Sequence, residues 1–532
     1  MTDLIDELSS ASADVPSKEA LVVVLQMAQT VIDEQSIEIQ HLRKQLFGRK
    51  SEKVLPGQES LFKKMLEALT EPKKDATKEE PSTDEDKEAP KKRRPNQKRR
   101  KLEPTRTEEI KVPDGERPCP KCGVLRCTLG HVRSVVIEYT PAKFEVIEYL
   151  REKVVCRPCD GEITLAPQPK ERVIERALPG PKLLGALVIN KGVDGLPLRR
   201  TQKIFIRAGL DIPVRTLNRW EGFAHQILEP IIRRIQHKVF EADVINLDDT
   251  GLRVRNSQRK GETVRGHIWV FIGRKFDPGG DLSKTEEFVF YMYADTWEAK
   301  HPEAFLDGCK AVLQGDAYRG YERIASADSG DHIGKLLAGC CMHARRPFAQ
   351  ALEANIKAAG FFVERFQRIY QIEAKAKQQG LTADLRLELR QERSLPLMEE
   401  IRDHARELSA LPLLKPMKTG VTYFVNQWDK LIVPFTVDGR LEIDNGSAER
   451  RLRRVASGRK AWLFAGSADG AKRFADVLSV VSTADAAGVD AGLYLPSVMS
   501  YIDSWPNSRI DDLLPHRWPV VFCQTGQQEP TK

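Results

Sequence analysis

The order of apolar segments between residues 244 and 339 constrains the fold of this chain more than any other feature. VINLDDTGLRV, GHIWVFIG (266–273) and EFVFYMYAD (287–295) show the patterning of antiparallel strands. A helical stretch near 297–308, a strand in AVLQGDAYRGY and a short strand in KLLAGC follow. We therefore predict three strands, a helix, a strand, a helix and a strand in one mixed sheet.

That succession is typical of a ribonuclease-H-like fold. Residues 349–414 are rich in Leu, Glu, Arg and Ala and predict helices that interrupt the sheet, before NQWDKLIVPF resumes the chain. We expect a multidomain α+β protein. Its ribonuclease-H-like catalytic domain would span 241–485, with a helical insertion at about 349–430 and a C-terminal region at 486–532.

The stretch at 441–474, LEIDNGSAERRLRRVASGRKAWLFAGSADGAKRF, combines a turn, a helix and a high density of charge. Asp, Asn and Gly at 444–446 favour a turn, and Ser447 is placed to cap a helix. Glu449 lies in the first helical turn among arginines, either as a favourable charge at a helix N-terminus or where cations and phosphates meet. Apolar residues recur at i, i+4 and i+7 and predict a face packed on a core: Ala448, Leu452 and Val455.

Length and charge limit the class of protein to which the chain can belong. A chain of 532 residues should contain two or more domains, and its net charge of +8 is unevenly distributed, which matters for partners more than the total does. The N-terminal MTDLIDELSSASADVPS is acidic without an apolar core, and no apolar run approaches a membrane span. We expect no signal peptide, no membrane partner and a cytoplasmic location, where thiols stay reduced.

A heptad pattern marks the N-terminal region, residues 15–70. The pattern is typical of a coiled coil, in which one polar core position fixes register and strand number. We expect a homo-oligomer that associates through this helix, the alternative being an amphipathic helix packed on its own domain. The heptad positions are Leu21, Leu25, Ala28, Ile32, Gln35, Ile39, Leu42 and Leu46.

Residues 71–110 cannot form a core, because they consist largely of Lys, Glu, Asp, Pro, Ser and Thr; we predict a disordered linker. Its second half, KKRRPNQKRRK, carries eight cations and no acid. This arm is either merely solvated or binds DNA phosphates without regard to sequence. Its cations are Lys91, Lys92, Arg93, Arg94, Lys98, Arg99, Arg100 and Lys101.

Two C-x-x-C pairs lie in residues 111–170, in CPKCG and CRPC. Strand-like VRSVVIEYT and KFEVIEYLREKVV separate them and predict a hairpin, as in a zinc ribbon. Four thiolates surround Zn²⁺ tetrahedrally and leave no open position for water, so we expect one structural zinc ion. Its ligands would be Cys119, Cys122, Cys156 and Cys159.

Residues 171–240 have a helical pattern. Within them, IFIRAGLDIPVRTLNRW predicts a helix, a turn at Gly209 and a second helix opening at Pro213. This arrangement resembles a helix-turn-helix, whose second helix enters the major groove. This second helix either binds in a DNA groove or only packs against its own domain. Its exposed side carries Arg215, Thr216, Asn218 and Arg219.

Three acids, Asp248, Asp316 and Glu449, fall near the ends of predicted elements, two strands and a helix. Carboxylates brought together repel one another unless a cation neutralises them, and hard oxygen ligands suit Mg²⁺ or Mn²⁺. Two such ions activate a water or a 3′-hydroxyl and stabilise the leaving oxygen in phosphodiester displacement. The pattern therefore predicts a two-metal phosphodiester site.

The chain resembles DDE-type transposases of the bacterial insertion-sequence sixty-six family. The shared landmarks follow the family's order: FGRKSEK, CPKCG with CRPC, DDTGLRV, LQGDAYRGY, AGCCMHARRPF, IDNGSAERRLRR, GRKAWLFAGSADGAKR and YLPSVM. The resemblance implies a transposase that binds its element's terminal inverted repeats and performs Mg-dependent strand cleavage and transfer to target DNA. It implies Asp248, Asp316 and Glu449 as the catalytic acids, with Asp249 as the alternative to the first.

The same resemblance implies a helical insertion between Asp316 and Glu449 and a nucleoid-associated location. It also allows companion proteins, encoded by the same element, as partners. The chain departs from the family pattern where Asp249 replaces Glu and where Gly446 and Ala461 replace Asn. None of these removes a catalytic carboxylate, although Gly446 adds freedom to the turn that aims Glu449.

Further cations surround these motifs. Cys340 and His343 form a C-x-x-H pair without two more ligands nearby, which we interpret as structural. A second set of cations either binds DNA phosphates or forms ion pairs on a solvated helix. These candidate DNA ligands are Arg345, Arg346, Arg450, Arg453, Arg459 and Lys460.

Two other functions fit the sequence. One is a zinc-ribbon DNA-binding or regulatory protein derived from a transposase, with an inert catalytic fold. The other is a plain nuclease without strand transfer. The presence of all three acids favours the transposase.

Overall fold

The computed structural model describes residues 121–122, 124, 143–154, 164–167, 169, 172–174, 177–259, 261–326, 336–352 and 356–524. The chain divides into two compact units, Met1–Thr70 with Val146–Lys532, and Glu71–Glu145. The first unit contains almost all of the described residues. The predicted coiled coil, the basic arm and three of the four zinc cysteines lie outside them; the fourth, Cys122, is exposed.

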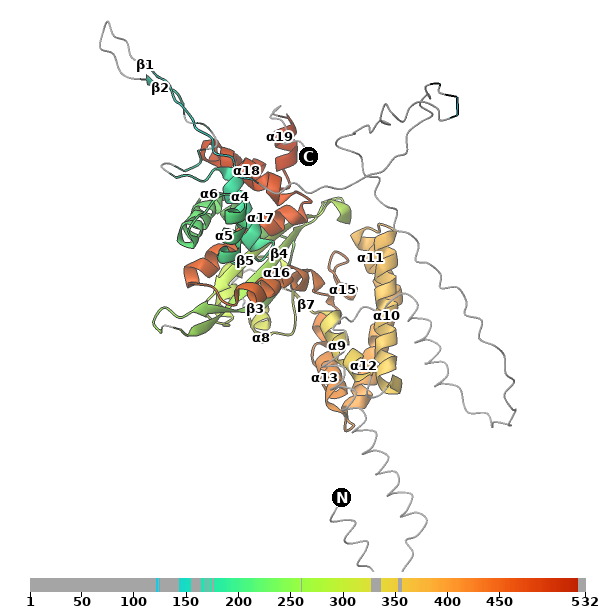
Figure 1. Ribbon diagram of the computed structural model, residues 1–532. Coiled ribbons are helices and arrows are strands. Elements are labelled where there is room, and N and C mark those ends of the chain that lie inside the picture. Colours follow the sequence, from blue (N-terminus) through green and yellow to red (C-terminus); the bar gives the residue numbers. More distant parts are fainter. Residues whose placement is uncertain are drawn as a thin grey trace, which may run out of the picture. The chain divides into compact units, whose positions relative to one another are not determined.

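Helices account for most of the described chain (Figure 1). The N-terminal helices are α4 (Pro181–Gly192), α5 (Leu198–Arg207) and α6 (Val214–Phe240). The central helices are α7 (Lys300–Leu306), α8 (Arg319–Ser326), α9 (Cys341–Ala351), α10 (Ile356–Gln378), α11 (Ala383–Leu389), α12 (Leu395–Ser409), α13 (Lys415–Asn426), α14 (Trp428–Leu431) and α15 (Val433–Thr436). The C-terminal helices are α16 (Gly446–Trp462), α17 (Ala468–Ala486), α18 (Ala491–Tyr501) and α19 (Trp518–Gln524).

Shorter helical segments and the strands complete the fold. A π-helix, η4 (Arg390–Ser394), joins α11 to α12, and 3₁₀ turns are η3 (Leu282–Lys284), η5 (Ile502–Ser504) and η6 (Asn507–Leu513). The strands are β1 (Lys153–Val154), β2 (Thr164–Leu165), β3 (Val244–Arg255), β4 (Thr263–Lys275), β5 (Glu286–Ala294), β6 (Val312–Gln314) and β7 (Leu337–Ala338).

A five-stranded sheet in the order β5-β4-β3-β6-β7 forms the centre of the large unit. β3, β4 and β5 pair antiparallel, whereas β6 pairs parallel with β3 and with β7. The parallel strands are connected through α7 and α8, and β7 leads into α9. The predicted succession of three strands, a helix, a strand, a helix and a strand is confirmed.

The two faces of the sheet are covered by different helices, because side chains alternate along each strand. On one face, Leu252 and Val254 of β3 pack with Leu452 and Val455 of α16 and with apolar residues of α17. On the other, Phe271 contacts Phe305 of α7, and Trp269 contacts Tyr321 of α8, with ring centroids 4.6 and 6.2 Å apart. The apolar face predicted for residues 448–455 is thus confirmed.

The outer strand β5 is bonded by side chains of α17. The backbone N–H of Tyr291 donates to Ser479 Oγ (2.8 Å), and that of Val289 donates to Thr483 Oγ1 (3.1 Å). Thr483 in turn donates to Val289 O (3.2 Å). These hydroxyls satisfy backbone groups that an edge strand otherwise presents to other chains.

The N-terminal helices have the predicted helix-turn-helix outline. α5 ends at Arg207, the chain turns at Gly209 with φ of +93°, and α6 begins after Pro213. Only glycine adopts such a positive φ without strain, which accounts for the residue at the turn. α6 then continues for 27 residues and packs along β4, β5 and α17.

Helices α9 to α15 lie where the helical insertion was predicted, and we refer to them as the insertion. It begins at Cys341, earlier than the predicted 349, because CMHARRPF is already helical. The insertion has a core of its own, in which the rings of Phe348 and Phe362 stack with centroids 4.0 Å apart. Figure 1 shows its helices α10 to α13 gathered beside the sheet.

A buried ion cluster holds the far end of the insertion. The Arg390 side chain is fully buried in the π-helix and donates from Nε to Glu373 Oε1 (2.7 Å) and from Nη1 to Pro434 O (2.8 Å). Arg386 also donates to Glu373 (2.8 Å). Burial raises the pKa of Glu373, but hydrogen bonding and charge from Arg390, and then Arg386, outweigh it and lower that pKa below its usual value.

Only a short strand pair is described near the predicted zinc ribbon. β1 pairs antiparallel with β2 across the CRPC segment, and residues 143–152 are not in a strand. The prediction that KFEVIEYLREKVV forms one long strand of a hairpin between the two cysteine pairs is therefore wrong for these residues; VRSVVIEYT lies outside the described residues. No helix among the described residues is long and apolar enough to cross a membrane.

Glu373→Gln is expected to lower the free energy of unfolding by about 3–5 kcal/mol, because it leaves buried Arg390 without its counter-charge. The stabilisation is fully present above the ordinary glutamate pKa of about 4.3 and is lost as pH falls through the lower folded value. Denaturant titrations at several pH values measure this. Asp403→Asn, which removes an exposed partner of Arg402, is the control and should have little effect.

Candidate active site

Strand register places Asp248 beside Asp316. β3 and β6 pair in parallel with Asn246 opposite Gln314, and each aspartate lies two residues further along its strand direction. Alternation therefore puts Asp248 on the face of the sheet that carries Asn246, whereas Asp316 follows the end of β6. α16 covers this same face.

A network of buried amides fixes α16 against these two strands. Asn246, Gln314 and Asn445 are each 0% exposed. Asn246 Nδ2 donates to Gln314 Oε1 and to Asn445 Oδ1, both at 3.0 Å. Asn445 Nδ2 donates to Leu247 O (2.9 Å), next to Asp248. Because Asn445 immediately precedes α16, the network positions the helix turn that carries Glu449.

The start of α16 differs from its prediction. The helix begins at Gly446 with Asn445 as its N-cap residue, and Ser447 is inside the helix. Ser447 Oγ is buried without a hydrogen-bond partner in the described part of the chain, so its predicted role as a cap is wrong. Asn445 does not cap either, because its side chain is committed to the strands. The turn is closed instead by Asp444, whose Oδ1 accepts from the Gly446 N–H (2.8 Å).

In each of the three acids, one carboxylate oxygen is held by a hydrogen bond or an ion pair. Asp248 Oδ1 accepts from the Asp249 N–H (2.8 Å), and Asp316 Oδ1 accepts from the Tyr318 N–H (3.0 Å). The contacts of Glu449 use only Oε1, which lies 3.1 Å from Arg346 Nη2 and 3.4 Å from His343 Nε2. Both partners of Glu449 come from α9, the first helix of the insertion. The described hydrogen bonds and ion pairs leave the second oxygen of each acid uncommitted.

Electrostatics show that the acids share one environment. Burial, together with repulsion from Asp316, Asp249 and Glu449, raises the pKa of Asp248 to about 7, although the hydrogen bond from the Asp249 N–H opposes this rise. Burial, and then the charge of Arg346, lower the pKa of His343. Within the described ranges, no three His, Cys, Asp or Glu side chains converge closely enough to hold a metal ion as they stand.

Asp249 lies on the opposite face of β3 from Asp248. Its Oδ2 is 2.7 Å from Nδ1 of the buried His267, and its Oδ1 accepts from Trp297 Nε1 (2.9 Å). The Trp297 ring stacks on Tyr318, with centroids 5.0 Å apart. Both oxygens of Asp249 thus hold the side chains that cover this face, which distinguishes it from Asp248.

Comparisons with known proteins identify the family of this chain. A family model described as Transposase IS66 family matches residues 176–473. The chain belongs to this family. A model described as the zinc-finger binding domain of transposase IS66 matches residues 116–160, and one described as Transposase C of IS166 homeodomain matches residues 36–106. The resemblance noted from the sequence is confirmed.

Two relatives from Sinorhizobium fredii (strain NBRC 101917 / NGR234) are similar over most of the IS66-family chain. The uncharacterized protein y4hP is 31% identical and spans 76% of this chain and 74% of its own length. The uncharacterized protein y4qI is 30% identical and spans 77% of this chain and 75% of its own length. Among solved structures, the Drosophila P element transposase strand transfer complex is similar at 10% identity and a TM-score of 0.32, over 57% of this chain and 93% of that one.

The arginines of α16 in this IS66-family protein divide by helix face. Arg451 pairs with Glu287 of β5 (3.1 Å), and Arg454 pairs with Asp485 of α17. Arg459 donates to Thr250 Oγ1 of β3 (2.9 Å), so the structure gives it a packing role beside Asp248. The candidate DNA ligands that stay exposed on this helix are Arg450, Arg453 and Lys460.

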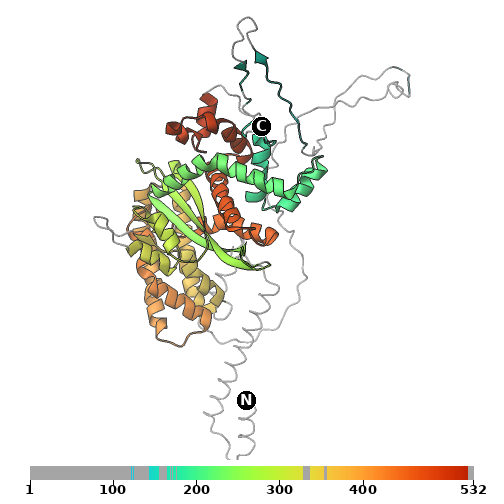
Figure 2. The same ribbon diagram turned by 90° about the vertical axis from the view of Figure 1, so that its left-hand side faces the viewer.

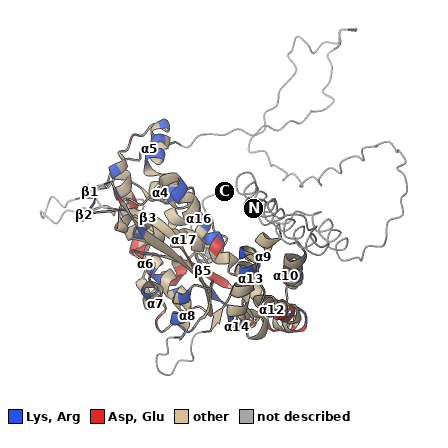
Figure 3. Cartoon of the chain, turned by 90° about the horizontal axis from the view of Figure 1, so that it is seen from below, with Lys and Arg blue, Asp and Glu red and all other residues tan. Residues whose placement is uncertain are grey.

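Other predicted DNA ligands lie on different elements. Arg346 contacts Glu449, and Arg345, one residue before it on α9, is half-buried. Arg215 and Arg219 are exposed at the start of α6, as is Asn218, whereas Thr216 is half-buried. Figure 3 shows Lys and Arg also gathered on the neighbouring α5. The structure thus brings Arg346 to the acids and leaves Arg215 and Arg219 on the separate α5–α6 surface.

Sequence reasoning missed the amides of the network and the partners of Glu449. Asn246 and Gln314 are polar residues inside otherwise apolar strands, each two residues before a predicted acid. That shared spacing is a signal that could have identified them. The C-x-x-H pair was interpreted as structural. Cys340 Sγ does accept from the Asn445 N–H (3.2 Å), whereas His343 lies against Glu449.

Asn445→Ala should lower the free energy of unfolding by roughly 2–4 kcal/mol, because it orphans buried groups on β3 that cost about 1–3 kcal/mol each. Chemical denaturation measures the change. Ser447→Ala is the matched control two residues away: its hydroxyl has no partner, so stability should be unchanged or slightly higher. Equal stability of the two variants would show that the network does not hold these elements together.

Proposed function

We propose that this IS66-family chain is a DNA transposase that binds the terminal inverted repeats of its element and catalyses Mg-dependent strand cleavage and strand transfer. The observation that carries the proposal is the arrangement of Asp248, Asp316 and Glu449. They come from β3, the loop after β6 and α16, are separated by 67 and 132 residues, and influence one buried charge. Each is oriented through one oxygen, and the other has no partner among the described residues.

The fold we propose for the catalytic domain is ribonuclease-H-like. When the strands β3 to β7 are renumbered 1 to 5 in sequence order, the sheet has the order 3-2-1-4-5. Strand 2 is antiparallel to strand 1, whereas strands 4 and 5 are parallel to strand 1. This order supports the assignment, as does the placing of acids on the first strand, after the fourth, and on a helix packed against the first. The long segment between β7 and α16 would then be an insertion in that fold.

The donor chemistry fits Mg²⁺ or Mn²⁺. Carboxylate oxygens are the ligands these ions prefer, and the mutual repulsion of the acids is relieved by a divalent cation. Asp248, Asp316 and Glu449 would hold two ions, with Asp249 excluded because both of its oxygens are bonded elsewhere. When bound, the ions supply an activated hydroxyl and stabilise the leaving oxygen of a phosphodiester.

The protein groups around the acids have separate tasks in this proposal. Arg346 and His343 orient Glu449 through Oε1, which leaves Oε2 for a metal. Arg459 holds β3 to α16 through Thr250. The exposed Arg450, Arg453 and Lys460, together with Arg345, bind the phosphates of the DNA strand next to the scissile bond. The Asn246–Gln314–Asn445 network keeps the three acid-bearing elements in register.

The remaining segments serve DNA binding and assembly in the same proposal. The heptad helix brings protomers together so that two transposon ends are paired, and the basic arm at 91–101 adds affinity without sequence discrimination. The α5–α6 helix pair presents Arg215 and Arg219 to a DNA groove. Terminal repeats, target DNA and companion proteins of the element are the expected partners, in the bacterial cytoplasm.

Asp248→Asn, Asp316→Asn and Glu449→Gln are each expected to abolish cleavage and joining while leaving DNA binding nearly intact, because each removes a metal ligand. The assay follows nicking and joining of DNA that carries both ends of the element, with and without Mg²⁺. Asp249→Asn is the matched control and should reduce the rate by about tenfold at most, the equivalent of one weakened hydrogen bond.

The outcomes separate the candidate functions. Joining of a cut 3′ end to target DNA supports the transposase, whereas cleavage without joining indicates a nuclease. A Glu449→Gln protein with near-normal cleavage would make that glutamate a structural residue. Binding without any Mg-dependent cleavage by the unaltered chain would support the inert regulatory protein.

One zinc ion per chain is expected at Cys119, Cys122, Cys156 and Cys159, as the zinc-finger model over 116–160 suggests. Replacing Cys119 and Cys122 together by Ser should remove the ion and unfold the segment, because metal binding supplies much of its folding free energy. Elemental analysis of the purified protein measures the zinc. Cys309→Ser, at a buried cysteine of the sheet domain, is the control and should keep full zinc content.

A further inference from the structure

The β3–β4 hairpin extends beyond both neighbouring strands. β5 pairs with β4 only from His267 onward, and β6 pairs with β3 only over Val244–Asn246. The remaining paired residues, 252–255 of β3 with 263–266 of β4, form a two-stranded extension that we call the hairpin arm (Figure 2). It starts a few residues beyond Asp248, on the same strand.

One face of the arm is packed and its edge is bonded. Leu252 and Val254 are each 1% exposed and join the core formed with α16 and α17. The Arg255 N–H donates to Ala465 O (2.9 Å), and the Ala465 N–H donates to Arg253 O (2.8 Å). The arm is therefore held in place by the segment that follows α16, the helix of Glu449.

The other face of the arm carries arginines. Arg253 and Arg255 alternate with the buried residues and are exposed, and Arg265 of β4 lies directly opposite Arg253 in the ladder. The Arg265 guanidinium also reaches over Gly251: its Nε is 3.0 Å from where a Cβ of that glycine would lie. Like charges directly opposite one another destabilise an antiparallel pair, so a bound anion would stabilise this arrangement.

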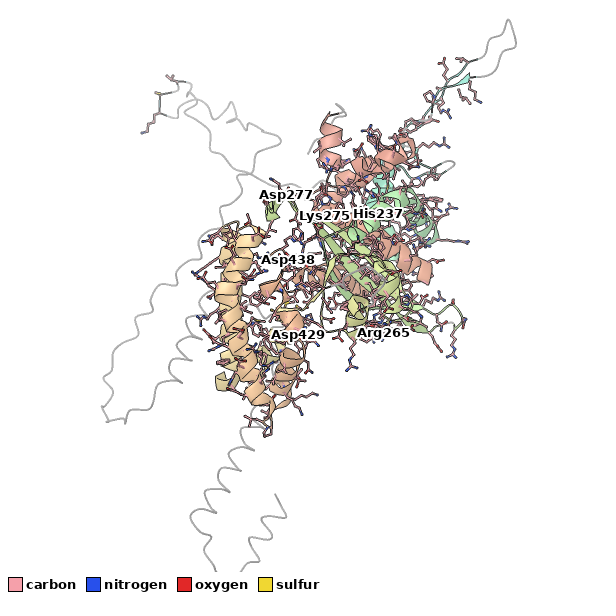
Figure 4. All side chains as sticks on the ribbon, turned by 180° about the vertical axis from the view of Figure 1, so that it is seen from behind. His237, Arg265, Lys275, Asp277, Asp429 and Asp438 are labelled. Atoms are coloured by element: carbon pink, nitrogen blue, oxygen red, sulfur yellow. The ribbon has the colours of Figure 1, made fainter. Side chains whose placement is uncertain are left out.

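No described carboxylate forms an ion pair with Arg253, Arg255 or Arg265. The acids at the ends of these strands are bonded elsewhere, since Glu262 lies 3.7 Å from Arg259, and Asp295 accepts from the Tyr293 hydroxyl (2.8 Å). Figure 4 labels Arg265 at the arm end of β4, at the opposite end of the strand from Lys275, which does pair with Asp243.

We propose that this arginine face of the hairpin arm binds the phosphate backbone of DNA, on the opposite face of β3 from Asp248. The inference rests on the proposed function and adds to it a DNA-binding surface built from the first two strands of the sheet. Guanidinium groups bind phosphates bidentately, and a duplex offers a continuous row of them. Asp248 and Arg253 are five residues apart, about 17 Å along a strand, and alternation puts their side chains on opposite faces of β3. The arm would therefore contact DNA away from the scissile phosphate.

The test replaces Arg253 and Arg265 together by Gln in the full chain, on an Asp248→Asn background so that DNA is bound and not cut. Affinity for a duplex is measured from low to moderate salt. Loss of two phosphate contacts should reduce the slope of log K against log salt by about 2, and weaken binding at physiological salt by at least about tenfold. The control, Arg233→Gln, removes an equally exposed arginine that is paired with Glu229 and should leave the slope unchanged.

Two results would overturn the proposal. One is an unchanged salt slope in the double variant, provided its thermal unfolding shows that it is folded. The other is unchanged DNA binding with a lower oligomeric state by sedimentation, which would assign the face to a second copy of the chain. Failure of the proposed function is distinguishable, because it appears as absence of cleavage by the chain with Asp248 intact, whatever the binding slopes show.

Discussion

The hydrogen bonds among Asn246, Gln314 and Asn445 are the interaction on which the candidate site depends. Three amides without charge are buried at the junction of β3, β6 and the start of α16, and each donor has an acceptor. Buried polar groups are costly unless all are satisfied, so the network accepts one arrangement of the three elements and penalises others. It extends through Arg274, which donates to Asn246 Oδ1 (2.8 Å) and to Glu287 of β5. Glu287 in turn accepts from Arg451 of α16.

The helical insertion is tied to this junction and is not a passive appendage. The Cys341 N–H donates to Ile443 O (3.0 Å), so the first turn of α9 is bonded to the segment that leads into α16. Arg346 and His343, the partners of Glu449, lie on the same helix. At the other end, Arg386 links the buried Glu373 to Glu442, three residues before Asn445. The insertion therefore contacts the candidate site through α9 and the segment before α16 through Arg386 of α11.

Much of the fold was predictable because it follows from local patterning. The alternation in GHIWVFIG and EFVFYMYAD indicated β4 and β5, and the i, i+4, i+7 pattern of Ala448, Leu452 and Val455 indicated the packed face of α16. The roles of Ser447 and Asn445 were not predictable from local rules, since long-range bonds to β3 decide them. Likewise, adjacent Asp248 and Asp249 look alike in sequence, and only the packing of His267 and Trp297 separates them. The helix over CMHARRPF was not predicted from the composition that marked residues 349–414, and it accommodates Pro347.

The hydroxyls of Ser479 and Thr483 on α17 stand in for a neighbouring strand along β5. A sheet closed in this way cannot be lengthened at that side by a strand from another molecule. Two copies of the chain therefore have no route to a shared, continuous sheet through this part of β5. The same closure protects the edge against strand-to-strand aggregation whenever many copies are held close together on one DNA molecule.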